Sequence, residues 1–361
     1  MSLRIGQITT ATTAAPTWNE SEHPRGAADN SGQFTEKELS KSEVTLGGAP
    51  ETVFTKKYDK VKEKVEAFHA ELELAVAGLG DDTNWNNYLH TMSNFHFYSL
   101  YDQLLISLQR PDASRVAGFR KWQEHDRSAM KGEKGISILR PAVVKTKEKD
   151  AAGKPVIGPD GKPVSSSKVI GFSTATVFDV SQTDGKPLPE AYAELSEEPP
   201  AGFIEDLEQS IRDAGFAVSY EAIPGNGHGF TEPTGKRVVI DEKLSPAERA
   251  MTLAHERGHI ELGHLERMAE YHTGHDGARG AMEVEAESFA YVVCRAQGMS
   301  TAVGGASSTY VAGWSRTDPT AVRKSAEAVA KAVKTVLGSD LFVAREAAAS
   351  GSSNGEEQLA A

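Results

Sequence analysis

The sequence predicts an α+β fold of two domains, and three observations support this prediction. The chain has 361 residues, which is long for one ordinary core and comfortable for two. Its first half mixes helical spacing with β-branched and alternating segments, whereas its second half is mainly helical with a small sheet. A Pro-rich, acidic stretch between the halves has the composition of a linker.

Changes in composition predict the limits of each part. We expect a disordered tail at 1–52, a first domain at 53–183, a linker at 184–200, a second domain at 201–340 and a disordered tail at 341–361. The tails are rich in small and polar residues and show no clear period, which is typical of disorder.

Apolar spacing and breaker residues predict the elements within each domain. In the first domain we expect helices near 56–79, 85–93, 98–110 and 118–125, and strands at 136–144 and 169–180. In the second we expect a helix at 203–214, strands at 216–220 and 237–240, two further helices that carry the chemistry, and a last helix at 319–337.

Charge separates the two halves. The net charge of −12 argues against a nucleic-acid coat over the whole surface. Residues 85–147, however, hold ten Lys/Arg and five Asp/Glu, whereas residues 201–297 hold nine and seventeen. This difference in sign indicates two different tasks.

The chain shows no signal for export or for a membrane. No apolar run approaches the roughly 18 residues that a membrane helix needs. The N-terminus lacks a basic start followed by an apolar block. The one cysteine, Cys294, excludes an intrachain disulfide and is expected to be a buried apolar residue. We therefore expect a cytoplasmic protein with no membrane partner.

The segment "LAHERGHIELGH" carries a metal-site pattern. His255 and His259 are four residues apart, which on a helix is about 40° of rotation, so both imidazoles leave the same face. Glu256, one residue on, is placed to act as a general base toward a metal-activated water. Zinc is the expected ion, or another divalent metal.

The flanking residues predict that this motif lies on a helix. Ser245 is a candidate N-cap, Pro246 suits the first helical position, and Glu248 completes a Ser-x-x-Glu capping box. Gly263 is a plausible stop.

The third ligand is expected on the next helix, "AMEVEAESFAYVVCRAQG". Glu283 and Glu287 are also four residues apart, so one could bind the metal and the other could accept an imidazole N–H. A third histidine would need to be six residues after His259, where Leu265 stands. His264 is one residue short, and we assign it to packing or helix termination.

"HERGHIELGH" followed by "EVEAESFA" resembles the ImmA/IrrE type of gluzincin-like metallopeptidase domain. The resemblance implies that Glu283, three residues before Ala286, is the third ligand. It also implies that Glu287 is an acid that supports the ligands.

The first domain is similar to the single-stranded-DNA-binding domain of ArdC-type antirestriction proteins. The similarity lies in "FYSLYDQLLISLQRPDASRVAGFRKWQEHDRSAMKGEKGISILRP" and "VFDVSQTDG", and "SSTYVAGWSR" near the end also fits. It covers roughly residues 55–337 with the same domain order. It implies a plasmid- or phage-borne protein that protects incoming DNA from restriction and binds single strands.

Cations along the phosphates and aromatic rings under the bases are what such binding needs. The candidate DNA-binding residues are Tyr98, Arg115, Arg120, Lys121, Trp122, Arg127, Lys131 and Lys134. For the aromatic residues, Trp122 among them, the alternative is burial in the core. For the cations, it is an ordinary solvated face.

Three functions compete at this stage. The first is an antirestriction protein that binds single-stranded DNA and carries a metallopeptidase site, with a host protein as its substrate. The second is a regulatory metalloprotease that cleaves a repressor-type protein. The third is a non-enzymatic DNA-binding protein with a structural zinc, in which His228 would be the fourth ligand to look for.

Overall fold

The computed structural model describes residues 52–147, 154, 156–157, 165–187, 196–225, 227–267, 278–300 and 319–349. Residues 1–51, most of the linker, the segment 307–316 and the end of the chain lie outside this range. The disorder predicted for 1–51 and for 350–361 therefore stays a prediction.

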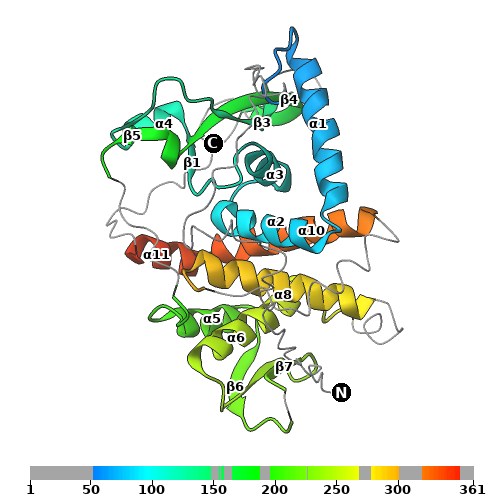
Figure 1. Cartoon of the computed structure of the whole chain (residues 1–361). Coiled ribbons are helices and arrows are strands. Elements are labelled where there is room, and N and C mark those ends of the chain that lie inside the picture. Colours follow the sequence, from blue (N-terminus) through cyan, green and yellow to red (C-terminus); the bar gives the residue numbers. More distant parts are fainter. Residues whose placement is uncertain are drawn as a thin grey trace, which may run out of the picture.

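The two-domain α+β fold is confirmed, and Figure 1 shows how its parts are arranged. Helices α8 (Ala278–Ala296), α10 (Pro319–Leu337) and α11 (Asp340–Ala349) cross the middle of the molecule. The N-terminal helices and the longest strands lie on one side of them. Helices α5 and α6 and a small sheet lie on the other.

The first domain packs helices against an antiparallel hairpin. Its helices are α1 (Val61–Gly78), α2 (Asp82–Phe95), α3 (Leu100–Gln109) and α4 (Phe119–Glu124). Its strands are β1 (Val116–Gly118), β2 (Arg127–Ala129), β3 (Ile136–Lys147), β4 (Ser165–Asp179) and β5 (Thr183–Gly185). Strand β4 lies between β1 and β3, and β2 pairs with β5.

Local caps explain where the helices begin. Asp81 accepts hydrogen bonds from the backbone of Thr83 and Asn84 at 3.0 and 3.2 Å, so α2 begins three residues before the predicted Trp85. Ser99 accepts one from the backbone of Asp102 at 3.2 Å, so α3 begins at Leu100.

The second domain places a mixed sheet beside two packed helices. Its elements are α5 (Phe203–Asp213), β6 (Ala217–Glu221), β7 (Gly229–Glu232), β8 (Arg237–Asp241), α6 (Pro246–Glu261) and α8. Strand β8 pairs in parallel with β6 and antiparallel with β7. Two elements differ from the prediction. Strand β7 lies between the two predicted strands, where no strand was expected. Helix α11 covers 341–349 of the tail that was predicted to be disordered, so that part of the prediction is wrong.

A continuous apolar core joins the two domains. It includes buried residues of α1, α2 and α3 as well as of α5, α6, α8 and α10. The indole Nε1 of Trp85 in α2 donates a buried hydrogen bond to Ser288 in α8 at 3.0 Å. Cys294 is buried in this core, as predicted. None of the helices in the described ranges has the length and apolar character needed to cross a bilayer.

Candidate metal centre and basic surface

Helix α6 has the ends that the sequence predicts. The Ser245 hydroxyl accepts a hydrogen bond from the Glu248 backbone, and the Glu248 carboxylate accepts one from the Ser245 backbone at 3.0 Å. Pro246 occupies the first turn. After the helix, Gly263 has φ of +68°, a left-handed conformation that turns the chain away. The capped helix is thus confirmed.

Three donor atoms converge between α6 and α8. The Nε2 atoms of His255 and His259 are 3.0 Å apart, and Oε2 of Glu283 lies 3.4 Å from the first and 3.8 Å from the second. Ligands bound at 2.0–2.2 Å to a tetrahedral ion lie roughly 3.3 Å from each other. Side chains with these donor atoms and separations fit a divalent transition metal.

The electrostatics of the cluster also suit a cation. Burial alone lowers the pKa of His255, but a hydrogen bond with Glu283 and the charges of Glu283, Glu256 and Glu287 raise it to about 9. Burial alone raises the pKa of Glu283, but His255 and His259 hold it well below its usual value. A positive charge is therefore stabilised where the three side chains meet.

Glu256 is buried beside the donor cluster and held by the sheet. Only 3% of the residue is exposed. Its Oε2 atom accepts a hydrogen bond of 2.7 Å from the hydroxyl of Thr231, in β7. Thr231 is not among the residues predicted from the sequence, because strand β7 was not predicted either.

Gly258 allows α6 and α8 to approach each other closely. A Cβ atom at this position would lie 3.0 Å from the Phe289 ring and 3.3 Å from the backbone of Ala286. Both neighbours belong to α8, the helix that carries Glu283. The absence of a side chain at Gly258 therefore sets the separation across which the donor atoms meet.

His264 is more than a packing residue. It is 1% exposed, and its Nδ1 atom lies 2.9 Å from Nδ1 of His259. Its Nε2 atom lies 2.9 Å from Oε2 of Glu285, and the hydroxyl of Ser325 contacts the other oxygen of that carboxylate. The sequence shows Glu285 two residues after Glu283, so a supporting carboxylate could have been predicted. Its partner in α10, Ser325, could not.

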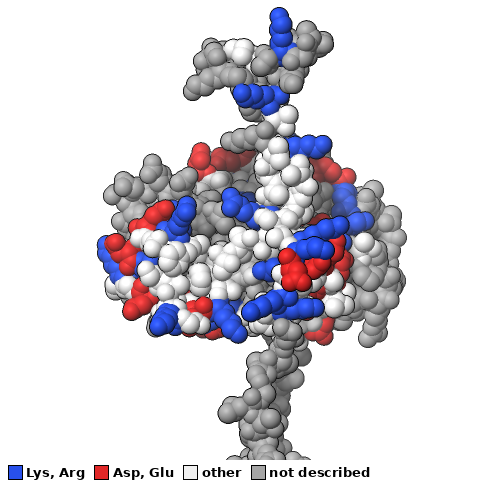
Figure 2. Space-filling view, turned by 90° about the horizontal axis from the view of Figure 1, so that it is seen from above, with Lys and Arg blue, Asp and Glu red and all other residues white. Residues whose placement is uncertain are grey.

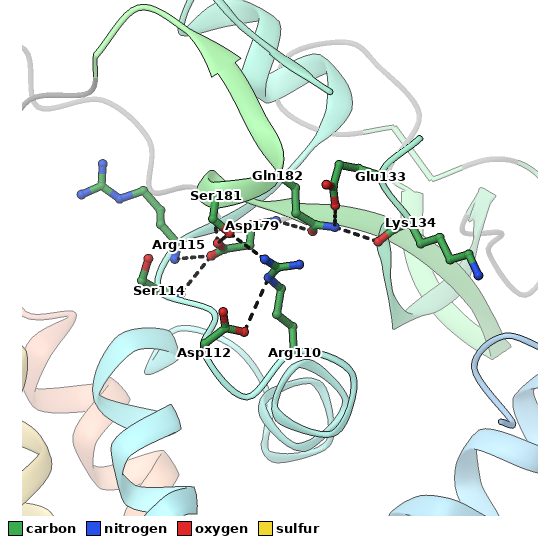
Figure 3. Close-up of polar contacts among 9 residues, drawn as sticks. All are labelled: Arg110, Asp112, Ser114, Arg115, Glu133, Lys134, Asp179, Ser181 and Gln182. Carbon is green, nitrogen blue, oxygen red and sulfur yellow. Dashed lines mark hydrogen bonds and ion pairs between the residues drawn. The ribbon is translucent and has the colours of Figure 1, made fainter. Parts of the chain in front are cut away.

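In the first domain, the Asp179 network (Asp179, Ser181 and Gln182) holds two loops (Figure 3). The Asp179 carboxylate accepts hydrogen bonds from the backbone of Ser114 and Arg115 at 2.8 and 3.0 Å. Gln182 donates to the backbone carbonyl of Lys134 at 2.8 Å. The side chains of Arg115 and Lys134 point away from the network (Figure 3), so it fixes their backbones and leaves their charges outside.

The predicted cations differ in how they are placed. Arg120, Lys131 and Lys134 are exposed, whereas Arg115 is half-buried and Lys121 lies 3.2 Å from Glu124. Seen from above in Figure 2, Lys and Arg side chains are interspersed with acidic ones rather than gathered into one patch.

The structure corrects one predicted DNA contact. Trp122 is fully buried, and its indole donates to the Phe178 carbonyl at 2.8 Å, so no base can stack on it. Arg127 donates to Thr183 and to the Lys186 carbonyl, which ties β2 to β5. Tyr98 is half-buried, packs edge-on against Phe95 and donates to the Val116 carbonyl at 3.3 Å. DNA contacts by Arg127 and Tyr98 stay predictions.

Comparison with known proteins gives matches in both domains. Residues 54–178 match the model of the N-terminal domain of anti-restriction factor ArdC, and residues 215–294 match that of the IrrE N-terminal-like domain. An uncharacterised Bacillus anthracis protein, pXO2-81, is 25% identical over 300 residues, which cover 73% of this chain and 49% of that protein. The chain thus spans about half the length of this curated relative.

Two solved structures are also similar. The metal-free structure of the antirestriction ArdC protein from the R388 plasmid is 20% identical, with a TM-score of 0.41, over 70% of this chain and 86% of that one. Its Mn(II)-bound structure is 19% identical, with a TM-score of 0.39, over 67% and 84%.

Replacing Gly258 with alanine should weaken metal binding. The added Cβ would press against Phe289 and Ala286 and force α6 and α8 apart, at a cost of about 1–3 kcal/mol. We expect a higher Kd for zinc in a chelator competition assay. Gly78→Ala is the control, because its Cβ would meet only an ordinary contact. Equal zinc affinity in Gly258→Ala and wild type would contradict this account of the helix approach.

Replacing Asp179 with asparagine should destabilise the first domain by about 1–3 kcal/mol, because hydrogen bonds to a charged acceptor are lost. Burial alone raises the pKa of Asp179, but hydrogen bonds from Ser181, Arg115 and Ser114 outweigh it and lower the pKa. The carboxylate therefore stabilises the fold above its unfolded pKa, and this contribution is lost as pH falls through the lower folded value.

Urea unfolding at neutral and at acid pH measures this effect. The difference between Asp179→Asn and wild type should shrink at acid pH. Asp184→Asn, at an exposed carboxylate nearby, should change stability little at either pH. A constant difference across pH would show that the charge of Asp179 is not the cause.

Proposed function

We propose that this chain is an ArdC-type antirestriction protein, because its residues 54–178 match the ArdC N-terminal domain and its residues 215–294 match the IrrE-like domain that follows it. Its first domain binds single-stranded DNA and its second carries a metal-dependent peptidase site. The observation that carries this proposal is the convergence of His255, His259 and Glu283 beside the buried Glu256. The same proposal includes a plasmid or phage origin and a cytoplasmic location.

His255, His259 and Glu283 are the residues that would hold the metal. Within the described residues these three side chains form the donor cluster, with no fourth His, Cys, Asp or Glu in it. Hydrolytic sites have three protein ligands and keep one position for water, whereas structural zinc sites fill all four positions with protein ligands. Zinc suits the donor set, and another divalent metal is the alternative. A divalent ion here would supply Lewis acidity.

Glu256 is the proposed general base. Its Oε2 atom accepts the hydrogen bond from Thr231, which fixes the carboxylate and leaves Oε1 for a proton from water. The carboxylate then passes that proton to the leaving amine. A protein of the host is the proposed substrate class.

The first domain supports single-strand binding through exposed cations on a fixed backbone. Lys131 and Lys134 are exposed on the turn before β3, and Gln182 holds the Lys134 carbonyl. Helix α4 contributes the exposed Arg120 and Phe119, which is 46% exposed. Cations and an exposed ring are what a phosphate backbone and its bases need.

Substituting Glu256 by glutamine tests which activity protects DNA. The amide keeps an acceptor for Thr231 but cannot take a proton, so peptide hydrolysis should fall about 10²- to 10⁴-fold. Zinc content should stay at the wild-type level. If transferred DNA survives restriction as well with this variant as with wild type, proteolysis is not the protective step. Unchanged hydrolysis of a mixed peptide library would reject Glu256 as the base.

The Lys131→Ala, Lys134→Ala double variant tests DNA binding. Each lost phosphate contact should reduce the slope of log affinity against log salt by about 0.7 for a single strand. We therefore expect a slope shallower by about 1.4 in a fluorescence titration with an oligonucleotide. The double variant Lys324→Ala, Lys331→Ala removes the same charge from exposed sites on α10 and should keep the wild-type slope. Equal slopes in both double variants would place DNA elsewhere.

A further inference from the structure

A row of buried polar side chains leads away from the donor cluster. We call it the His264 network: His264, Glu285 and Ser325. These residues are 1%, 9% and 6% exposed. The row begins at Nδ1 of His259, the ring nitrogen opposite the one that faces Glu283. It reaches through Glu285 in α8 to Ser325 in α10.

The hydrogen-bonding capacity of these groups orders the protons. The Ser325 hydroxyl donates to one oxygen of Glu285, and an ionised carboxylate can only accept. The Nε2 atom of His264, 2.9 Å from the other oxygen, must therefore carry a proton. In a neutral imidazole the Nδ1 atom is then an acceptor.

The same order extends to His259. Its Nδ1 atom lies 2.9 Å from the accepting Nδ1 of His264, so it carries the proton and donates it. Its Nε2 atom is left with a lone pair, pointed toward His255 and Glu283. Every hydrogen bond in the row runs toward Glu285, and the result is the tautomer that a metal ion needs.

Backbone structure keeps the row in place. His264 follows the left-handed Gly263, and its backbone N–H donates to the His259 carbonyl at 3.1 Å. Glu283 and Glu285 leave α8 about 200° apart around its axis. One helix therefore supplies a donor to the cluster with one carboxylate and supports His259 with another.

We propose that His264, Glu285 and Ser325 are positioning residues, which hold His259 in the tautomer whose Nε2 binds the metal. This proposal rests on the proposed metal site. In this proposal Glu285 is the carboxylate that supports His259, and it acts through His264. Any role of Glu287 near His255 is separate.

Glu285→Gln is the decisive variant, because it keeps the shape and changes the direction of donation. Its amide oxygen can still accept from Ser325, which leaves the NH₂ group facing His264. His264 must then accept at Nε2 and donate at Nδ1, so the proton on His259 moves to Nε2 and blocks the donor atom. We expect the Kd for zinc to rise on the order of 10- to 100-fold.

Ser325→Ala is the milder variant, and it serves if Glu285→Gln does not fold. It removes one hydrogen bond to Glu285 and should weaken zinc binding in the same direction by a smaller factor. Ser210→Ala is the matched control. Ser210 in α5 is also buried and accepts a hydrogen bond of 3.0 Å from Arg257 of α6, but it does not lie in the row.

Two measurements on the full chain separate positioning from general damage. Nitrogen NMR of isotope-labelled histidine reports which ring nitrogen of His259 carries the proton in metal-free protein. Wild type should show a protonated Nδ1, and Glu285→Gln a protonated Nε2. The absorption spectrum of the Co(II)-loaded protein should shift in Glu285→Gln and remain unchanged in Ser210→Ala.

The outcomes are distinct. Wild-type protein that binds neither zinc, manganese nor cobalt would reject the proposed metal site, and the NMR result would still decide the tautomer. An unchanged tautomer and unchanged zinc affinity in Glu285→Gln would overturn the positioning role. Equal weakening by Ser325→Ala and Ser210→Ala would overturn it as well, since it would mean that any buried hydroxyl has the same effect.

Discussion

The close contact of α6 with α8 at Gly258 is the constraint on which the rest of the second domain depends. The two histidines lie on α6 and the carboxylate on α8, so their donor atoms meet only at this separation. The same contact brings the end of α6, with His264, against Glu285. Strand β7 holds Glu256 through Thr231. The missing side chain at Gly258 thus sets the separation of the ligands, and strand β7 holds the proposed base.

The opposite charges of the two domains suit their proposed partners. Residues 201–297 carry nine basic and seventeen acidic side chains, and some of those acids surround His255 closely enough to raise its pKa. That field attracts a small cation and would repel a phosphate backbone. Residues 85–147 have the reverse balance. Separation into two domains lets one chain hold both fields, although the upper face in Figure 2 mixes the two signs.

Local patterns in the sequence predicted what local forces decide. The capping box of Ser245 and Glu248, and the spacing of His255 and His259, needed only neighbouring residues, and the helix formed as expected. Asp179 and Gln182 also form a capping box, and both residues lie within the segment "VFDVSQTDG". Its effect on the loops around Ser114 and Lys134 was hidden, because those partners lie 65 and 48 residues away.

Contacts across the fold explain the remaining differences. Thr231 and Ser325 lie 25 and 40 residues from the carboxylates they contact, and no spacing rule connects them. The choice between Glu283 and Glu287 also needed more than periodicity, since both recur at helical spacing. Trp122 shows the limit for aromatic residues, because a ring among cations has the same sequence signature whether it stacks on a base or fills the core.

Helix α10 belongs to both domains. Arg323 donates to the Tyr101 hydroxyl at 2.8 Å and pairs with Glu73, and Lys334 donates to the Phe97 carbonyl at 2.9 Å. Two residues from Arg323, the Ser325 hydroxyl donates to the Glu285 carboxylate in α8. A recombination event that exchanged only one domain would leave these groups without their matching partners in the shared core. The two halves are therefore expected to be inherited together as one unit rather than exchanged separately.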